Sequence, residues 1–219
     1  MLPVGPATIT LAVRPAPSGQ IGLFLEQLPQ WRWLAQRVGM GQRVLSLFSH
    51  SGAASLAAAA AGAAVVSVDA SRPATALARG NAVLSGLADR PIAWVEDDAR
   101  KVVGRLGRRG ERFDAVVLDP PSWGHGARGE AFAIDRDLEP LLDDVARLLS
   151  ADGPGTFLVT CHSPRWTADR LRHVVEGALA RAGRPGARIE ADSLVLDAES
   201  GRRLALGVFA RAGGAAHSR

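Results

Sequence analysis

The stretch VLSLFSHSGAASLAAAAAGAAVVSVDAS, residues 44–71, decides the fold class of this chain. It opens with an apolar run, passes through a polar turn into a segment of alanines, and closes with a second apolar run that ends at Asp69. Alanine has the highest helix propensity, and short valine-rich runs favour strands. Strand, helix and strand in this order predict a βαβ unit with two parallel strands.

The same alternation continues along the chain. Ser71 is placed to cap a helix that runs from Pro73 towards Leu87. Three further strands are predicted in IAWVEDDA, FDAVVLDPPS and GTFLVTCHS, residues 92–99, 113–122 and 155–163. A helix between the last two is predicted by apolar residues at helical spacing, namely Leu138, Leu141, Leu142, Val145 and Leu148. Five strands separated by helices predict an α/β fold with a doubly wound, Rossmann-like and mostly parallel sheet.

Both ends of the chain depart from this alternation. ATITLAVRP and IGLFLEQ, residues 7–15 and 21–27, predict an N-terminal β-hairpin, and ARIEADSLVLD and RRLALGVFARA, residues 187–197 and 202–212, predict an antiparallel C-terminal hairpin. We therefore expect a hairpin extension and helix over residues 1–38, and one doubly wound domain over residues 39–211. The last residues, 212–219, are expected to be a disordered tail.

Composition narrows the class of protein. A chain of 219 residues with 47% hydrophobic residues suits one domain with a sizeable core. The single cysteine, Cys161, excludes an internal disulfide and a multi-cysteine zinc site, so we expect no metal. No apolar run resembles a membrane span, and the N-terminus lacks the basic region and apolar block of a signal peptide. These features predict a cytoplasmic protein.

The charge balance is basic, with a formal net charge of +4 and a sequence pI of about 10.7. Arginine supplies nearly all of the positive charge, and RKVVGRLGRRGER, residues 100–112, concentrates it. Arginine pairs with phosphate and stacks on bases, so this balance is compatible with a nucleic-acid partner. A GC-rich genome that favours arginine codons, and a merely solvated helix face, explain it equally well.

Acidic residues recur where predicted strands end. In doubly wound sheets ligands bind outside the carboxyl ends of the strands. There, Asp69 can accept hydrogen bonds from both hydroxyls of a ribose, and Asp98 can accept one from an adenine amine, although either acid can instead cap a helix. The turn Ser49–Gly52 has neither the three-glycine dinucleotide pattern nor a Gly-Lys-Ser/Thr sequence. Together with Asp119, the acids outline a nucleoside ligand.

The fourth predicted strand leads into VVLDPPSWGHG, residues 116–126. A buried carboxylate without a partner costs free energy, and two prolines remove two backbone donors while fixing the direction of the chain. Asp119, Pro120 and Pro121 therefore form a stiff corner that donates few hydrogen bonds. Such a corner can shape a slot for a flat base.

Five segments carry a resemblance to a known family. The segments of residues 22–34, 44–71, 78–87, 95–99 and 112–124 resemble S-adenosylmethionine-dependent RNA methyltransferases related to the large-subunit rRNA cytosine-C5 enzymes. The resemblance runs from about Gly22 to Ala210 and includes the Asp-Pro-Pro-Ser motif. It departs from the family at Ser46, where many methyltransferases have an acid, and at Leu28, where the relatives usually have arginine. The RNA-binding domain that long relatives carry in front is also missing from this sequence.

The resemblance implies roles for individual residues. The catalytic loop would consist of Asp119, Pro120 and Pro121. Contacts to S-adenosylmethionine would come from Gln27, Ser49, His50, Ser51, Gly52, Asp69, Ala70, Asp98, Ala99 and Asp119. Contacts to the substrate are expected from Ser122, Trp123, His125 and His162. Of these, Trp123 can stack on a base or be ordinary packing, and His125 lies in a glycine-rich loop that could fold over the substrate.

The end of the fifth predicted strand leaves the chemistry open. Methylation of cytosine at carbon 5 requires a nucleophile on carbon 6, which a cysteine thiolate supplies best. Cys161 in LVTCHSP, residues 158–164, lies close to the Ser-Cys-Ser of the relatives, but a single cysteine at a strand end is equally a small core residue. His162 can act as a base or simply be hydrogen-bonded.

Three functions therefore remain open at the level of sequence. The first is methylation of a base in rRNA or tRNA, with RNA as the partner. The second is methylation of a small molecule on the same fold, and the third is cofactor binding without catalysis. The target, the methylated atom and the oligomeric state are not predicted.

Overall fold

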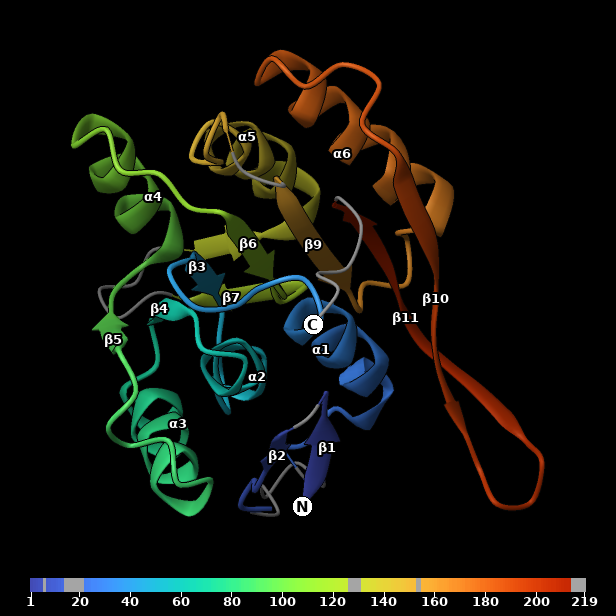
Figure 1. The fold of residues 1–219 in the computed structure, drawn as a ribbon. Coiled ribbons are helices and arrows are strands. Elements are labelled where there is room, and N and C mark those ends of the chain that lie inside the picture. The colour runs from blue at the N-terminus through green and yellow to red at the C-terminus, as the bar shows by residue number, and fades with distance from the viewer. Residues whose placement is uncertain (6, 14–21, 126–130, 153–154, 214–219) are drawn as a thin grey trace.

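A seven-stranded sheet forms the centre of the molecule in the computed structural model, which describes residues 1–5, 7–13, 22–125, 131–152 and 155–213 (Figure 1). Its spatial order is β10-β11-β9-β6-β3-β4-β5. Strands β3, β4, β5, β6 and β9 pair in parallel, whereas β10 and β11 are antiparallel. The bounds are β3 (Arg43–Leu47), β4 (Ala64–Asp69), β5 (Ile92–Glu96), β6 (Ala115–Leu118), β9 (Thr156–Cys161), β10 (Ile189–Asp197) and β11 (Arg203–Ala212). The predicted α/β, doubly wound fold is confirmed.

Helices cover both faces of this sheet (Figure 1). One layer contains α1 (Leu28–Ala35), α2 (Ala53–Ala60) and α3 (Arg72–Leu84), and the other contains α4 (Ala99–Arg108), α5 (Ile134–Ala146) and α6 (Ala168–Arg181). Alternate residues of a strand face opposite sides, and β6 shows this clearly. Val116 and Leu118 pack with α4, α5 and α6, while Ala115 and Val117 pack with α1 and α2. All four are buried, so β6 runs through the middle of the core.

The order of the strands reverses at β3. From β3 the chain moves to β4 and β5 on one side, and then returns to place β6 on the other side of β3. The connections that leave β3 and β6 therefore diverge, which opens a crevice at the carboxyl ends of these two strands. This is the place where the sequence puts the acids and the Asp-Pro-Pro corner.

The N-terminal hairpin is built from other residues than predicted. It pairs β1 (Leu2–Val4) with β2 (Ala7–Ile9), and not residues 7–15 with 21–27. Gly5 has a φ of 72°, which suits a tight turn. Within the hairpin, Val4 and Ile9 are buried. Residues 25–27 form instead the 3-10 helix η1 (Leu25–Gln27), which leads directly into α1. The predicted loop of residues 16–20 lies outside the described residues.

Three further boundaries differ from the sequence predictions. Ala212, expected in a disordered tail, pairs with Phe157 and Ile189 and ends β11, while residues 214–219 lie outside the described residues. Helix α3 ends at Leu84, and Leu148 lies just beyond α5. A short antiparallel pair, β7 (Trp123–His125) with β8 (Ala131–Ala133), follows the Asp-Pro-Pro corner and was not predicted. Its strands are too short to give a periodic signal.

The turn after β3 is held in an uncommon conformation. Phe48 and His50 have φ of 56° and 43°, in the left-handed region that non-glycine residues seldom adopt, and Gly52 has φ of 77°. Asn81, fully buried on α3, donates a 2.8 Å hydrogen bond to the carbonyl oxygen of Ser51. A Cβ at Gly52 would lie 2.8 Å from the Cβ of Ala78. Glycine therefore lets the turn sit against α3.

The close approach of Gly52 to α3 can be measured as stability. We expect Gly52→Ala to lower the free energy of unfolding by about 2–3 kcal/mol, because it combines backbone strain with a clash. Gly86→Ala is the matched control, since Gly86 has φ of 66° but open space around its Cβ position; it should cost only about 1 kcal/mol. Urea denaturation that gives equal losses for the two variants would contradict this account.

Candidate active site

A cavity of about 330 Å³ lies at the carboxyl ends of the central strands. Its volume is in the range of small-molecule sites. A neighbouring pocket of about 40 Å³, the narrower extension, shares Phe24, Phe48, His50 and Asp119 with it and is also lined by Ser46 and Trp31. The wall of the main cavity consists of Phe24, Phe48, His50, Val68, Asp69, Ala70, Ser71, Asp97, Asp98, Ala99, Asp119, Pro120, Pro121, Gly124, Phe132 and His162. The sequence prediction thus identified nine of these residues, and the structure brings them together around one space.

Asp69 joins the turn after β3 to the start of α3. Its Oδ2 accepts a 2.8 Å hydrogen bond from the backbone N–H of His50, and its Oδ1 accepts one of 2.8 Å from the N–H of Ser71. Ser71 in turn caps α3 by accepting from Ala74, as predicted. A carboxylate has about four acceptor positions, so Asp69 keeps acceptor capacity on the cavity side.

Asp98 is a helix cap and one partner of an ion pair. Its Oδ1 accepts hydrogen bonds from the backbone N–H groups of Arg100 and Lys101, at 2.9 and 3.2 Å, and its Oδ2 lies 3.0 Å from the Arg100 guanidinium. Only 7% of Asp98 is exposed. The strand β5 itself ends two residues earlier, at Glu96. The sequence leaves two roles open for Asp98, a helix cap and a contact to an adenine amine. The contacts of Asp98 within the protein are those of a helix cap.

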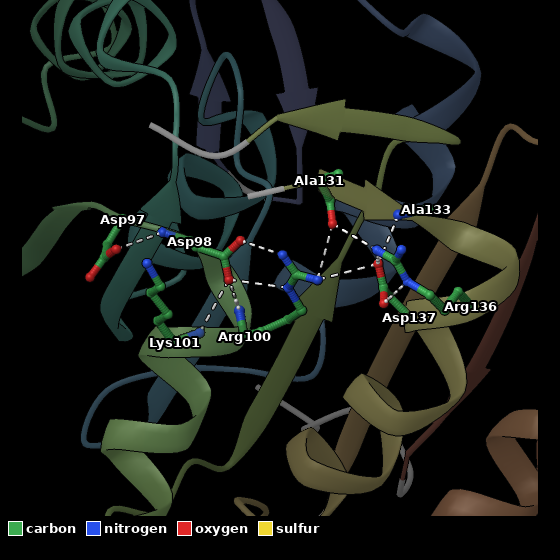
Figure 2. A network of polar contacts seen from close by, with 8 residues as sticks. All are labelled: Asp97, Asp98, Arg100, Lys101, Ala131, Ala133, Arg136 and Asp137. Carbon is green, nitrogen blue, oxygen red and sulfur yellow. Dashed lines mark hydrogen bonds and ion pairs between the residues drawn. The ribbon is translucent and has the colours of Figure 1, made fainter. Parts of the chain in front are cut away.

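Arg100 connects α4 with the segment that follows β7 (Figure 2). Its guanidinium lies 3.3 Å from the carboxylate of Asp137 and 3.3 Å from the carbonyl oxygen of Ala131. Arg136 contacts the same two groups, at 2.7 and 2.8 Å. Between them Phe132 turns its ring to the cavity and packs against the ring of Phe48, with centroids 5.2 Å apart. The ion pairs therefore fix an aromatic wall of the cavity.

His162 and Asp119 face each other across the mouth of the cavity. Asp119 follows β6 and accepts hydrogen bonds of 2.7 Å from Thr160 Oγ1 and from Gln27 Nε2. The Nε2 atom of His162 lies 3.5 Å from Asp119 Oδ1 and 3.1 Å from Gln27 Nε2. Gln27, expected to contact the cofactor, thus lies beside the Asp-Pro-Pro corner and lines the narrower extension.

Cys161 points away from this mouth. Its side chain has no exposed surface and packs in the main core cluster, and burial raises the pKa of its thiol from 9.0 to about 11. A thiol that stays protonated at neutral pH is a poor nucleophile. Because side chains alternate along a strand, the residue from this end of β9 that reaches the cavity is His162.

The remaining predicted substrate residues lie at the rim. Ser122 is exposed, and its carbonyl oxygen accepts a hydrogen bond from Ile134 N–H. Trp123 begins β7 and is 61% exposed. His125 ends β7, but its side chain lies outside what the structure describes. Neither Ser122 nor Trp123 lines the main cavity, whereas Gly124 does.

Several residues of the site escaped the sequence prediction. Phe24, Phe48 and Phe132 form the aromatic walls, and Thr160 and Glu26 are buried next to the mouth. Thr160 left a signal, since it is a polar residue inside an apolar strand and so needs a buried partner. The phenylalanines left none, because an aromatic residue in a loop is as easily ordinary packing.

The basic segment is split between two edges of the molecule. Arg100 and Lys101 begin α4 at the cavity, but the helix runs away from it, so Arg108, Arg109 and Arg112 lie towards the opposite edge of the sheet. Arg105 pairs with Asp97 on the way. Among the described residues, no group of three or more His, Cys, Asp or Glu side chains could hold a metal ion. In the same part of the chain, no helix is long and apolar enough to cross a membrane.

The strand order, the antiparallel last pair and a cavity at the switch point define a class of α/β proteins that bind a ligand at the carboxyl edge of the sheet. A model of the S-adenosylmethionine-dependent methyltransferase family matches residues 13–183, and the chain belongs to this family. The resemblance inferred from the sequence is thereby confirmed.

Individual relatives agree with this family. The chain is 36% identical over 138 residues to ribosomal RNA large subunit methyltransferase K/L of Shewanella baltica, which covers 62% of this chain and 19% of the relative. It is 32% identical over 183 residues to ribosomal RNA large subunit methyltransferase I of Shewanella amazonensis, which covers 83% of this chain and 45% of the relative. The chain therefore spans less than half the length of these curated relatives.

A solved structure agrees as well. The crystal structure of an S-adenosylmethionine-dependent methyltransferase from Agrobacterium tumefaciens superposes with a TM-score of 0.80 at 33% identity, over 89% of this chain and 64% of that one. The central sheet with its C-terminal antiparallel strands is thus shared with a member of the family.

The ion pairs around Asp137 give the site a pH-dependent contribution to stability. The hydrogen bond from Arg136, with the N–H of Ala133 and the charge of Arg100, holds the pKa of Asp137 at about 2, below its ordinary value of 3.8. A carboxyl group whose pKa is lowered in the folded protein stabilises the fold at pH values above its ordinary pKa. This stabilisation is lost as the pH falls through the lowered pKa. We expect Asp137→Asn to cost on the order of 1 kcal/mol at neutral pH, and the difference from wild type to vanish between about pH 4 and pH 2.

A matched control for this pH dependence is Asp144→Asn. Asp144 pairs with Arg147 on the exposed side of α5, where both side chains are more than half exposed. Exposed pairs contribute little. Chemical denaturation of the three proteins between pH 2 and pH 7 measures the effect; equal stability of Asp137→Asn and wild type at neutral pH would refute it.

Proposed function

We propose that this protein transfers a methyl group from S-adenosylmethionine to a base in rRNA or tRNA. The observation that carries the proposal is the Asp119-Pro120-Pro121 corner, which lies at the mouth of a cavity of suitable size with acids and aromatic rings in its wall. The names of the relatives, both large-subunit rRNA methyltransferases, support an RNA substrate. An RNA substrate of this kind would place the protein in the cytoplasm.

The cavity has the groups that S-adenosylmethionine requires. Asp69 has free acceptor positions for the two ribose hydroxyls, and the rings of Phe48 and Phe132 offer flat apolar surfaces to the adenine. Asp98 and Ala99 would meet the edge of the adenine at the start of α4. When bound, the cofactor supplies an electrophilic methyl group on a positively charged sulfur, which the carboxylate of Asp119 nearby would favour.

The methionine part would extend along the turn after β3. Ser49, His50 and Ser51 line the narrower extension, and Ala70 lines the main cavity next to Asp69. Gly52 does not line either space and instead packs against Ala78, so we assign it to the shape of the turn. Gln27 would act from the other side of the extension.

The acceptor base would enter between the Asp-Pro-Pro corner and His162. Pro120 and Pro121 have no N–H groups, so their carbonyls and rings can hold a flat base without competing donors. Trp123 is exposed at the rim, where base stacking is available to it. Ser122 and His125, which flank Trp123 and Gly124 in the sequence, would contribute at the same rim.

We further propose that the methylated atom is a nitrogen or an oxygen of the base. Such an atom supplies its own electron pair, whereas pyrimidine carbon 5 requires a nucleophile of the protein. The thiol of Cys161 is buried and its pKa is about 11, which supports a reaction without it. Asp119, hydrogen-bonded on both oxygens, would be the carboxylate that meets the entering base.

Transfer of labelled methyl groups tests the proposed function. Purified protein with labelled S-adenosylmethionine should label total RNA, and not a small-molecule extract of the same cells. Labelling of the extract alone would favour the small-molecule methyltransferase, and labelling of neither would favour a protein that binds the cofactor without catalysis. Digestion of the labelled RNA to nucleosides then identifies the base and the atom.

A separate variant tests the proposed contact of Asp69 with the cofactor. Asp69→Asn removes the charge that strengthens hydrogen bonds to ribose, so binding should weaken by roughly 1.5–3 kcal/mol. Asp89→Asn, an exposed acid between α3 and β5, is the control and should bind as wild type. Calorimetric titration with S-adenosylmethionine measures both; unchanged affinity of folded Asp69→Asn would refute the ribose contact.

Replacement of the cysteine tests the chemistry. We expect Cys161→Ala to transfer methyl groups at close to the wild-type rate, with a loss of about 1 kcal/mol in stability from the missing sulfur. Alanine is the better variant, because Cys161→Ser would bury a hydroxyl group. RNA that contains 5-fluorocytidine should form no covalent adduct with the wild-type protein. A trapped adduct, or an inactive Cys161→Ala protein that still binds the cofactor, would show a carbon nucleophile.

A further inference from the structure

His162 makes two directional contacts, one with each ring nitrogen. Its Nδ1 lies 2.8 Å from the backbone carbonyl oxygen of Leu206, and its Nε2 lies 3.1 Å from Nε2 of Gln27. Leu206 is on β11, Gln27 on η1, and His162 directly follows β9. The ring thus bridges two segments that lie far apart in the sequence, and it does so at the wall of the cavity.

A β-bulge makes the carbonyl of Leu206 available. Along the β10–β11 pair, Leu194 faces Gly207 and Val195 faces Ala205, so Leu206 is the extra residue of the bulge. A bulged residue is left out of the ladder, and its carbonyl can accept a hydrogen bond from elsewhere. Gly207 lets β11 pass close to β9, since a Cβ there would lie 2.6 Å from the carbonyl oxygen of Cys161. The bulge therefore serves the contact with His162.

The chemistry of the partners fixes where the hydrogens are. A carbonyl oxygen only accepts, so Nδ1 of His162 carries the proton and Nε2 of the neutral ring is an acceptor. The carboxylate of Asp119 also only accepts, so the nitrogen of the Gln27 amide faces it, at 2.7 Å. The two hydrogens of that amide then go to Asp119 and to His162. Donation therefore starts at Gln27, which donates to Asp119 on one side and to His162 on the other, and His162 donates on to Leu206.

We infer that His162 is a positioning residue for the reaction, which acts through Gln27 on the carboxylate of Asp119; this rests on the proposed function. Leu206 fixes the ring, the ring fixes the Gln27 amide, and the amide holds one oxygen of Asp119 while Thr160 holds the other. The remaining lone pairs of Asp119 are thereby aimed at the cavity. His162 is not the proton acceptor, because its acceptor nitrogen is already engaged by Gln27.

Protonation of the ring would break this arrangement. A protonated imidazole has N–H groups at both nitrogens, so Nε2 and the Gln27 amide would oppose each other as two donors. The new N–H would turn to Asp119, whose Oδ1 is 3.5 Å away. It would then occupy a lone pair of this carboxylate that the target nucleobase requires. The other acid that faces the ring is Glu26, with Oε1 3.8 Å from Nδ1. The inferred arrangement therefore requires the neutral ring, with its hydrogen on Nδ1.

Two substitutions separate positioning from proton transfer. His162→Gln keeps one donor and one acceptor but does not titrate, so single-turnover methyl transfer to total RNA should stay within about threefold of wild type at neutral pH. His162→Phe keeps a ring without polar atoms and should lower the rate on the order of 10- to 100-fold, with cofactor affinity retained.

A control variant and a contrary result complete the comparison of His162→Gln with His162→Phe. His173→Gln, on the exposed side of α6, should keep the wild-type rate. If His162→Gln is as slow as His162→Phe, the imidazole itself takes the proton and the inference is overturned.

A measurement without turnover makes the test independent of the substrate. Nitrogen-15 NMR of histidine-labelled wild-type protein at neutral pH should show His162 with its hydrogen on Nδ1, assigned by comparison with His162→Gln. A hydrogen on Nε2, or rapid exchange between the two forms, overturns the inference. If the protein methylates no RNA, the proposed function fails, while the NMR result still decides whether the ring is held as inferred.

Discussion

The in-register parallel pairing of β3 with both of its neighbours is the constraint on which the site depends. Leu47 pairs with Val68 of β4 and with Leu118 of β6, so the next residue of each strand, Asp69 and Asp119, lies in one row at the carboxyl edge. The buried alternation of apolar side chains specifies this register, because a slip of one residue would turn each strand inside out. Core packing thus sets the separation of two carboxylates that are 50 residues apart in the sequence.

The structural contacts of the acids at this edge are compatible with the ligand contacts proposed for them. Asp69 accepts hydrogen bonds from the N–H groups of His50, in the turn after β3, and of Ser71, the N-cap of α3, and Asp98 accepts them from the first turn of α4. Such bonds satisfy donors that helix ends leave unpaired, and they hold each carboxylate in one orientation. The cavity therefore needs little rearrangement to receive a ligand, and the helix-cap and ligand-binding interpretations of these residues do not compete.

Periodic and local signals explain how much could be predicted from the sequence. The strands, Ser71 as a cap and the acids at the carboxyl edge follow from alternation and propensity, and the Asp-Pro-Pro corner from the chemistry of proline. The contact of Gln27 with Asp119 joins positions 92 residues apart and has no periodicity. The bulge at Leu206 depends on how two strands meet a third. The choice between Cys161 and His162 rests on a single residue of register, which composition does not encode.

The β10–β11 hairpin has two parts that differ in their strand pairing. From Val208 onward β11 pairs with β9 and belongs to the sheet, whereas from Arg203 to Gly207 it pairs only with β10 and reaches past the end of β9 (Figure 1). The bulge lies at the junction and locks the register there. Residues can accordingly be gained or lost at the tip around Ser200 without shifting the carbonyl that holds His162. The hairpin can thus diverge in length and sequence during evolution while the site beneath it is preserved.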